Sequence, residues 1–172
     1  MKVIGLQNKK VKLSNYHPSW KKLYEEEKGK LLPLVEMFGL DIEHVGSTSV
    51  PGAKAKPIID IAIGVKNLED GKKFIKPLEL LGYEYKHDAG VKGRHYFCKG
   101  GENETHHVHI EEFNGVIWKN QVEFRDYLVK HKKSLAEYNE LKERLAKEFK
   151  DNRREYTLQK EDLIKSILKK VK

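Results

Sequence analysis

The stretch that decides the fold is Ile42–Val65, IEHVGSTSVPGAKAKPIIDIAIGV, in which a Gly-Ser turn and a Lys-Pro pair precede an apolar strand. Within that strand, the segment IIDIAI carries one charged residue, Asp60. Burial of an unpaired carboxylate is costly enough that such groups almost always have partners. Asp60 therefore needs compensation, which a divalent cation, a cationic neighbour or backbone N–H groups of the Gly46-Ser47 turn would supply.

The loop at 46–57 has the composition of a phosphate-binding turn. Its small residues leave backbone N–H groups free to face a phosphate oxygen, and a Ser-Thr-Ser run adds hydroxyl donors. The alternative is an ordinary turn whose prolines and glycines only satisfy backbone geometry. We favour phosphate binding, because an ordinary turn does not need three successive hydroxyl groups. The residues that we assign to the phosphate in this loop are Gly46, Ser47, Thr48 and Lys56, the last of which is alternatively a salt-bridge partner of Asp60.

Several motifs occur in the order found in one protein family. From about Tyr16 to the C-terminus the chain resembles the GrpB-like family of uncharacterised proteins, in the segments GSTSVPG, AKP, IID, THHVHI, FRDYLVKH, YNELKERLA and YTLQKEDLI. That family in turn resembles nucleotidyltransferases of the DNA polymerase beta type, whose motif joins a Gly-Ser turn to two carboxylates separated by an apolar residue. Val45–Ser47 and Asp60–Ala62 occupy those places. The resemblance implies a nucleotidyltransferase-like fold in which Gly46 and Ser47 hold a triphosphate.

Ala62 departs from this pattern, because it stands where the superfamily has its second carboxylate. Two-metal phosphoryl transfer holds two cations about 3.5–4 Å apart, and bridging carboxylates keep them there. A single aspartate does not do this. The fold is therefore better supported than the activity.

The composition is that of an ordinary soluble protein. Its 172 residues suit a single domain, 1–172, and are 35% charged and 38% hydrophobic. No apolar run approaches the ~20 residues that a membrane helix needs, and the N-terminus lacks the features of a secretion signal. The single cysteine, Cys98, excludes an internal disulfide, so we expect a cytoplasmic protein without a membrane partner.

The net charge of +8 favours anionic partners such as nucleotides. Nucleic acid is the weaker expectation, because the lysines are spread along helix faces that we expect to be solvated. These lysines include Lys142, Lys147, Lys150, Lys165, Lys169 and Lys170.

Hydrophobic periodicity and turn residues predict alternating helices and strands. The predicted helices cover 18–39, 67–82 with Asn67 as N-cap, and the chain from 118 onward with breaks near 132 and 151. The predicted strands cover 42–45, 58–65, 83–86, 94–99 and 105–113. This order predicts an α+β fold, with a mixed sheet, helices packed on one face and C-terminal helices.

Alternation along the strands predicts which side chains share a face, because successive residues point to opposite sides. In the 58–65 strand, three alternate isoleucines form an apolar face and Asp60 points to the other side. If the polar face of the 105–113 strand lies on the same side of the sheet, its residues converge on Asp60 beneath the turn. Those residues are His107, His109 and Glu111.

An H-x-H pair beside a carboxylate is a candidate ligand set for a divalent metal. We assign the metal to Asp60, His107 and His109, with Mg²⁺ or Mn²⁺ as the cation. Two alternatives stay open, in which the imidazoles bind a phosphate directly or are simply hydrogen-bonded within the protein. His44, which lies next to the turn, likewise either contributes to the site or only packs at the end of its strand.

Basic residues elsewhere would complete an anion pocket. Arg94 begins a strand predicted beside the histidine strand. Arg125 is either an exposed charge partner of Asp126 or an inward ligand, and we favour the second because aromatic residues flank it. A further cluster near the start of the last helix contains Arg153, Arg154, Tyr156 and Lys160.

The leading hypothesis is an enzyme that binds a nucleoside triphosphate with its metal and transfers a nucleotidyl group to an acceptor that the sequence does not identify. Lys56, Arg94 and Arg125 would stabilise charge on the phosphates, with Lys160 as a further phosphate ligand. The alternative is a non-catalytic module that binds a phosphate-containing ligand or a partner, which the missing second carboxylate favours. The catalytic residues of the first hypothesis are Asp60, His109 and Glu111.

Overall fold

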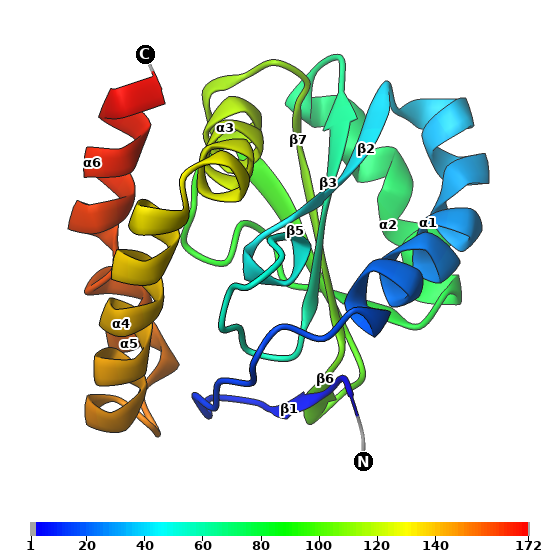
Figure 1. The fold of residues 1–172 in the computed structure, drawn as a ribbon. Helices are drawn as coiled ribbons and strands as arrows, with labels where there is room; N and C mark the ends of the chain where they lie inside the picture. The colour runs from blue at the N-terminus through cyan, green and yellow to red at the C-terminus, as the bar shows by residue number, and fades with distance from the viewer. Residues whose placement is uncertain (1–2, 172) are drawn as a thin grey trace.

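The structure is a computed structural model that describes residues 3–171, and its centre is a five-stranded mixed sheet (Figure 1). The strand order is β2-β3-β7-β5-β4, with β3 and β7 parallel and all other neighbours antiparallel. A small second sheet pairs β1 with β6. The elements are β1 (Leu6–Gln7), α1 (Ser19–Phe38), β2 (Asp41–Val45), η1 (Ser47–Ser49), β3 (Ile59–Val65), η2 (Leu68–Phe74), α2 (Ile75–Leu80), β4 (Tyr83–Tyr85), β5 (Arg94–Lys99), β6 (Asn103–Glu104), β7 (His106–Glu112), α3 (Val116–Lys130), α4 (Lys132–Glu148), α5 (Arg153–Leu158) and α6 (Glu161–Val171).

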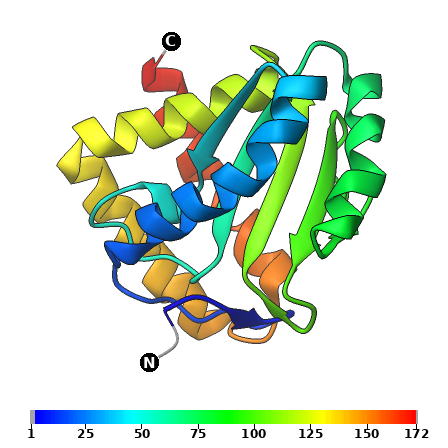
Figure 2. The same cartoon turned by 90° about the vertical axis from the view of Figure 1, so that its right-hand side faces the viewer.

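Helices α1 and α2 cover one face of the sheet, and the hydrophobic core lies beneath them (Figures 1 and 2). The alternate isoleucines of β3 and the apolar residues of β7 are fully buried there, as the alternation predicts. These residues are Ile59, Ile61, Ile63, Val108 and Ile110. The predicted α+β architecture with a mixed sheet is therefore confirmed.

The other face of the sheet is only partly covered by a helix. Trp118 of α3 packs there against Val45 and Ala62. The C-terminal helices α4, α5 and α6 lie on the same side of the sheet (Figure 1). A pocket is lined by residues of the strands and of α4 and α5. Ala62 thus serves as a small packing surface for α3, at the position where the nucleotidyltransferase motif has a carboxylate.

The predicted first helix has the expected ends. It begins after Pro18 and ends at Gly39, whose N–H donates to the Val35 carbonyl oxygen at 2.7 Å. A proline suits the start of a helix because its missing N–H would be unpaired there.

The predicted second helix is wrong in its first half. Residues 68–74 form the 3₁₀ segment η2, and the α-helical part begins only at Ile75. Asn67 does not cap this segment with its side chain, because its amide faces the Asp70 carboxylate at 3.4 Å instead. Gly71 also lies so close to His95 that an added Cβ would be 2.5 Å from the imidazole, so η2 packs tightly onto β5.

The sequence did not predict the two short strands β1 and β6, because a two-residue strand has no measurable periodicity. Within residues 3–171, no helix combines the length and the apolar character needed to cross a membrane.

Candidate functional site

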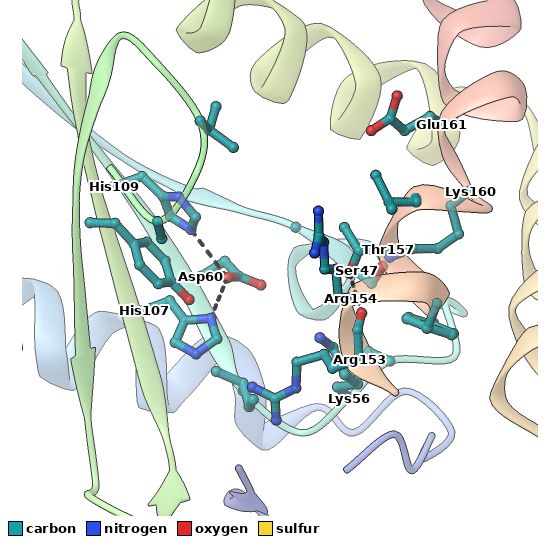
Figure 3. A pocket seen from close by; sticks show the side chains of 18 of the residues that line it. Ser47, Lys56, Asp60, His107, His109, Arg153, Arg154, Thr157, Lys160 and Glu161 are labelled. Atoms are coloured by element: carbon teal, nitrogen blue, oxygen red, sulfur yellow. Dashed lines mark hydrogen bonds and ion pairs between the residues drawn. The ribbon is translucent and has the colours of Figure 1, made fainter. Parts of the chain in front are cut away.

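A pocket of about 860 Å³ opens on the polar face of the sheet, between the strands and the C-terminal helices (Figure 3). Pockets that enclose small-molecule ligands have volumes of about 300–1,000 Å³, so this one has room for such a ligand. Its walls come from the turn after β2, from β3, β5 and β7, and from α4 and α5. The carboxylates that line it are Asp60 and Glu161, whereas its basic side chains are Lys56, Arg94, Lys142, Arg153, Arg154 and Lys160.

The Gly-Ser turn lies directly against Asp60. Gly46 has φ 70° and ψ −175°, in the left-handed region that favours glycine, and a Cβ added to it would be 2.6 Å from Asp60 Oδ2. Thr48 is buried, and its hydroxyl donates to the Ile58 carbonyl oxygen at 3.3 Å. Ser47 lines the pocket and faces α4, so Ser47 presents a hydroxyl to the pocket while Thr48 holds the loop.

Asp60 of β3 contacts two histidines of the neighbouring strand β7. Its Oδ1 lies 3.2 Å from His107 Nδ1 and 3.3 Å from His109 Nε2, and Figure 3 shows both imidazoles turned toward it. The parallel register of β3 and β7, which pairs Asp60 with His107 and Ala62 with His109, places the three side chains on one face. Burial would raise the pKa of Asp60, but hydrogen bonds from the two histidines outweigh it and hold the pKa well below its ordinary range. The carboxylate is therefore ionised.

His107 bridges Asp60 to a second buried carboxylate. Its Nε2 faces Glu104 Oε2 at 3.2 Å, and Glu104 also pairs with Arg153. Burial would lower the pKa of His107, but hydrogen bonds to Asp60, Cys98 and Glu104 raise it to about 10. His107 is thus an imidazolium that donates from both nitrogens.

His109 differs from His107 because its second nitrogen faces a cation. The Nη1 atom of Arg94 lies 3.1 Å from His109 Nδ1, and the Arg94 guanidinium stacks over the Tyr96 ring. Burial lowers the pKa of His109. The neutral ring accepts a hydrogen bond from Arg94 at Nδ1 and donates its Nε2–H to Asp60, which fixes its tautomer.

The sequence prediction that Lys142 lies on a solvated helix face is wrong. Lys142 is 1% exposed, and its Nζ lies 3.2 Å from Ser47 Oγ and also bonds the Lys54 carbonyl oxygen. Burial lowers its pKa to about 7. The spacing along α4 contains the missed signal, since Lys142 follows Tyr138 by four residues and precedes Leu145 by three, and both are buried.

Two further amines line the pocket, those of Lys160 and Lys56, and the pKa of each is lowered. Burial, together with Lys56 and Lys142, lowers the pKa of Lys160 to about 7. Burial and the neighbouring Arg153 lower the pKa of Lys56 to about 8. Amines with lowered pKa values are poised to gain full charge when an anion enters, because an opposite charge favours the ammonium form.

Two residues predicted for the site lie elsewhere in the described part of the chain. Glu111 is paired with Gly64 in the sheet, beyond His109, and accepts a hydrogen bond from Gln121 at 2.6 Å. Burial raises the pKa of Glu111 to about 7. Arg125 is bound to Glu43, Asp126 and the His44 carbonyl oxygen, and it does not line the pocket.

His44, which the sequence left open, packs at the end of its strand. Its ring stacks on Tyr24 with centroids 4.6 Å apart, and its Nε2 lies 3.1 Å from Thr48 Oγ1. Burial lowers the pKa of His44 to about 4, so the ring is neutral and braces the loop.

Asp60 offers a hard divalent cation one free carboxylate oxygen. Asp60 Oδ1 is shared by two imidazoles, which leaves Oδ2, beside Gly46. Mg²⁺ binds through one or two carboxylates together with substrate phosphates and water, so a single Mg²⁺ or Mn²⁺ carried by a polyphosphate fits this oxygen. Ala62 provides no carboxylate that could bridge a second cation to the first.

A group with softer donors lies next to the pocket. Cys98, Glu104 and His107 each offer one ligand atom, and these atoms lie within 4.8 Å of one another. His107 is the one member of this group that belongs to the ligand set predicted from the sequence, and the others come from β5 and β6.

The comparisons with known proteins agree on the family. The family model described as "GrpB protein" matches residues 10–170. The UPF0157 protein YqkA of Bacillus subtilis is 37% identical over 92% of this chain, which spans 46% of the length of YqkA. The crystal structure of the conserved protein GrpB from Enterococcus faecalis is 36% identical and superimposes with a TM-score of 0.85, covering 93% of this chain and 96% of that one.

A more distant likeness concerns the fold. The Cid1 poly(U) polymerase, in a crystal structure with MgGTP bound, superimposes with a TM-score of 0.55 at 16% identity, covering 77% of this chain and 44% of Cid1. The architecture is thus nucleotidyltransferase-like, as the sequence resemblance implied.

Proposed function

We propose that this chain, which belongs to the GrpB family, binds a nucleoside triphosphate or a similar polyphosphate in the pocket beneath the Gly46 turn. The observation that carries the proposal is the charge of the pocket wall, in which six basic side chains face two carboxylates. Such an excess of positive charge in a concave, partly desolvated site attracts a multiply charged anion. The nucleotidyltransferase-like fold, in which Cid1 was crystallised with MgGTP, favours a nucleotide as that anion.

The phosphates would lie between the turn and the C-terminal helices. Ser47 offers its hydroxyl, and Lys142 lies within hydrogen-bond distance of that hydroxyl. Lys160 lines the pocket directly after α5, close enough to Lys142 for the two charges to interact (Figure 3). Charge-assisted hydrogen bonds from such donors are roughly twice as strong as neutral ones, so these residues would provide most of the affinity.

A single Mg²⁺ or Mn²⁺ would accompany the nucleotide and contact Asp60 Oδ2. The cation would neutralise part of the phosphate charge, while His107 and His109 keep the carboxylate ionised and oriented. Because six basic groups already line the pocket, we expect the nucleotide to bind with the metal removed as well.

Nucleotidyl transfer to an acceptor is the second candidate function. The contact between Asp60 and the Gly46 turn favours it, since the nucleotidyltransferase motif joins these two features. His109 would then act beside Asp60 in the site, whereas Glu111 lies outside the pocket wall. A binding module without transfer chemistry is consistent with Ala62 and with the same pocket.

Isothermal titration calorimetry with ATP, in Mn²⁺ and in EDTA, tests the binding proposal. Lys160→Met removes one pocket charge and should weaken binding by about tenfold, the effect of one charged hydrogen bond. Lys22→Ala is the matched control, because it removes the same charge from a side chain that is 79% exposed. Failure of the unmodified protein to bind any nucleoside triphosphate would refute the proposal.

Release of pyrophosphate from bound ATP separates the two functions. A transferase should release it in the presence of Mn²⁺ and a mixture of acceptors, and Asp60→Asn should abolish the release. A binding module should release none, while Asp60→Asn should alter only the contribution of Mn²⁺ to affinity.

A further inference from the structure

Behind the pocket, a cysteine, a glutamate and a histidine meet where β5, β6 and β7 adjoin. Cys98 and His107 are direct cross-strand neighbours, and Glu104 precedes His107 by three residues. The three side chains are buried, with 8%, 6% and 6% exposure for Cys98, Glu104 and His107. We propose that this group, the cysteine cluster, binds a zinc-class divalent metal ion through Cys98 Sγ, a Glu104 carboxylate oxygen and His107 Nε2.

The donor types select the metal. Thiolate and imidazole are ligands for Zn²⁺ and similar borderline-soft ions, whereas Mg²⁺ prefers oxygen. Zinc lies about 2.0–2.3 Å from such ligands, which places ligand atoms about 3.3–3.8 Å apart in a tetrahedron. The ligand atoms of the cysteine cluster lie within 4.8 Å of one another, which is close to that spacing.

His107 is already oriented as a metal ligand. Its Nδ1 lies 3.2 Å from Asp60 Oδ1, so Nδ1 carries a proton and Nε2 is directed toward Glu104 Oε2, also at 3.2 Å. Histidine ligands commonly donate their other N–H to a carboxylate, which fixes the tautomer and raises the basicity of the ligating nitrogen. Asp60 would therefore act as a positioning residue for the metal, from the pocket side of the ring.

The charges balance when a metal binds. A divalent cation adds two positive charges, and two protons leave, one from the Cys98 thiol and one from His107 Nε2. The net charge of the cluster is unchanged, so the ion pair between Glu104 and Arg153 and the contact of His107 with Asp60 can persist. The metal takes the place of the proton between Nε2 and Oε2.

The metal would connect three strands and leave one coordination position open. The chain from Cys98 to His107 forms the end of β5, the tight turn through Gly100 and β6. Three protein ligands leave the fourth tetrahedral position for water or a ligand atom. The ligand atoms of the cysteine cluster lie on the side of His107 opposite Asp60, and none of them is assigned to the nucleotide, so this proposal does not rest on the proposed function.

Metal titration of the full chain tests the proposal. After removal of metal with EDTA and exchange into chelator-free buffer, Zn²⁺ is titrated in competition with a chromophoric chelator, and Co²⁺ is followed by absorbance. We expect one equivalent to bind with release of two protons, and the Co²⁺ complex to show a thiolate-to-cobalt charge-transfer band in the near ultraviolet. Absence of binding, or a Co²⁺ complex without the thiolate band, would overturn the proposal.

Variants locate the metal. Cys98→Ser and Glu104→Gln should each weaken Zn²⁺ binding by at least about tenfold, whereas His131→Gln, which removes an exposed imidazole outside the cluster and the pocket, should leave it unchanged. Loss of binding in His109→Gln with retention in Cys98→Ser would overturn the proposal and place the ion at Asp60 instead. If Cys98→Ser does not fold, as judged by circular dichroism, the Co²⁺ spectrum of the unmodified protein decides. Calorimetric titration of the same protein with ATP in EDTA measures nucleotide binding in the pocket separately from zinc binding.

Discussion

The two faces of the β3–β7 strand pair are built from alternate residues of the same two segments, yet they differ in almost every physical property. The face beneath α1 and α2 is made of aliphatic side chains, such as Ile61 and Ile110, that are fully buried. The face beneath the C-terminal helices carries Asp60, His107 and His109, which are joined by hydrogen bonds. The apolar core and the polar cluster are therefore separated by the pleat of one strand pair.

The difference has an energetic basis. Burial of one large aliphatic side chain stabilises the fold by about 1.5–3 kcal/mol. A buried hydrogen-bonded charge pair contributes little net stability, because desolvation offsets most of the attraction. The apolar face can hold the strands in register while the polar face presents groups that are costly to bury, and each of the three polar residues has a partner for this reason.

Truncation on the apolar face should have the largest effect on stability. Ile61→Ala removes a side chain that is 0% exposed and should lower the free energy of unfolding by about 2–5 kcal/mol. Urea denaturation measures this change, and ATP affinity of the remaining folded protein should be unaltered. A loss below about 1 kcal/mol would contradict the role assigned to this face.

Gly46→Ala tests the contact between the turn and the polar face. The added methyl group would approach Asp60 Oδ2 within 2.6 Å at a φ of 70°, so we expect a stability loss of about 1–3 kcal/mol and weaker nucleotide binding. The control is Gly29→Ala in α1, where an added Cβ meets nothing within 4 Å. That substitution should stabilise the protein by about 0.4–1 kcal/mol, and equal behaviour of the two variants in urea denaturation would refute the prediction.

The pH dependence of binding should reveal the buried amines. In the folded protein the pKa values of Lys142 and Lys160 are about 7, below the ordinary value of 10.5. Between pH 7 and pH 10.5 the unfolded chain binds more protons at these two lysines than the folded protein does. Their contribution to the free energy of unfolding therefore rises with pH over that range. Nucleotide binding should show the opposite trend, because phosphates favour the ammonium form, and affinity should fall about tenfold between pH 7 and 9.

Calorimetry in two buffers of different ionisation enthalpy measures the protons that accompany this binding. We expect proton uptake near pH 8, reduced in Lys142→Met. Binding without proton uptake would show that the amines are already charged in the free protein.

Arg125→Gln should have the smallest effect on the ligand. Its guanidinium is held by Glu43 and Asp126, outside the pocket wall, so ATP affinity should change less than about twofold. The free energy of unfolding should fall by about 1–3 kcal/mol, because charged hydrogen bonds are lost. A tenfold loss of ATP affinity in calorimetry would contradict this expectation and support the phosphate-binding role that the sequence predicted for Arg125.

Local sequence patterns predicted the strands and the residues on each of their faces, because both follow from the two-residue repeat of a strand. They also placed Gly46 and Ser47 before Asp60, since the turn and the strand are close in the chain. The convergence of His107 and His109 on Asp60 was predicted on the condition that both polar faces lie on one side of the sheet. The parallel register of β3 and β7 met that condition.

The sequence by itself thus determined the α+β architecture, the apolar face and the position of Asp60, through interactions between residues near one another in the chain. Only the tertiary structure decided that Lys142 enters the pocket, that Arg125 stays out of it, and that Cys98 meets Glu104 and His107. For Lys142 and Arg125 the physical reason is distance along the chain, whereas Cys98 and His107 lie close in the chain and meet through the register of β5 on β7. Lys142 meets Ser47 across 95 residues, and such a contact depends on how α4 packs against the loop rather than on any local periodicity.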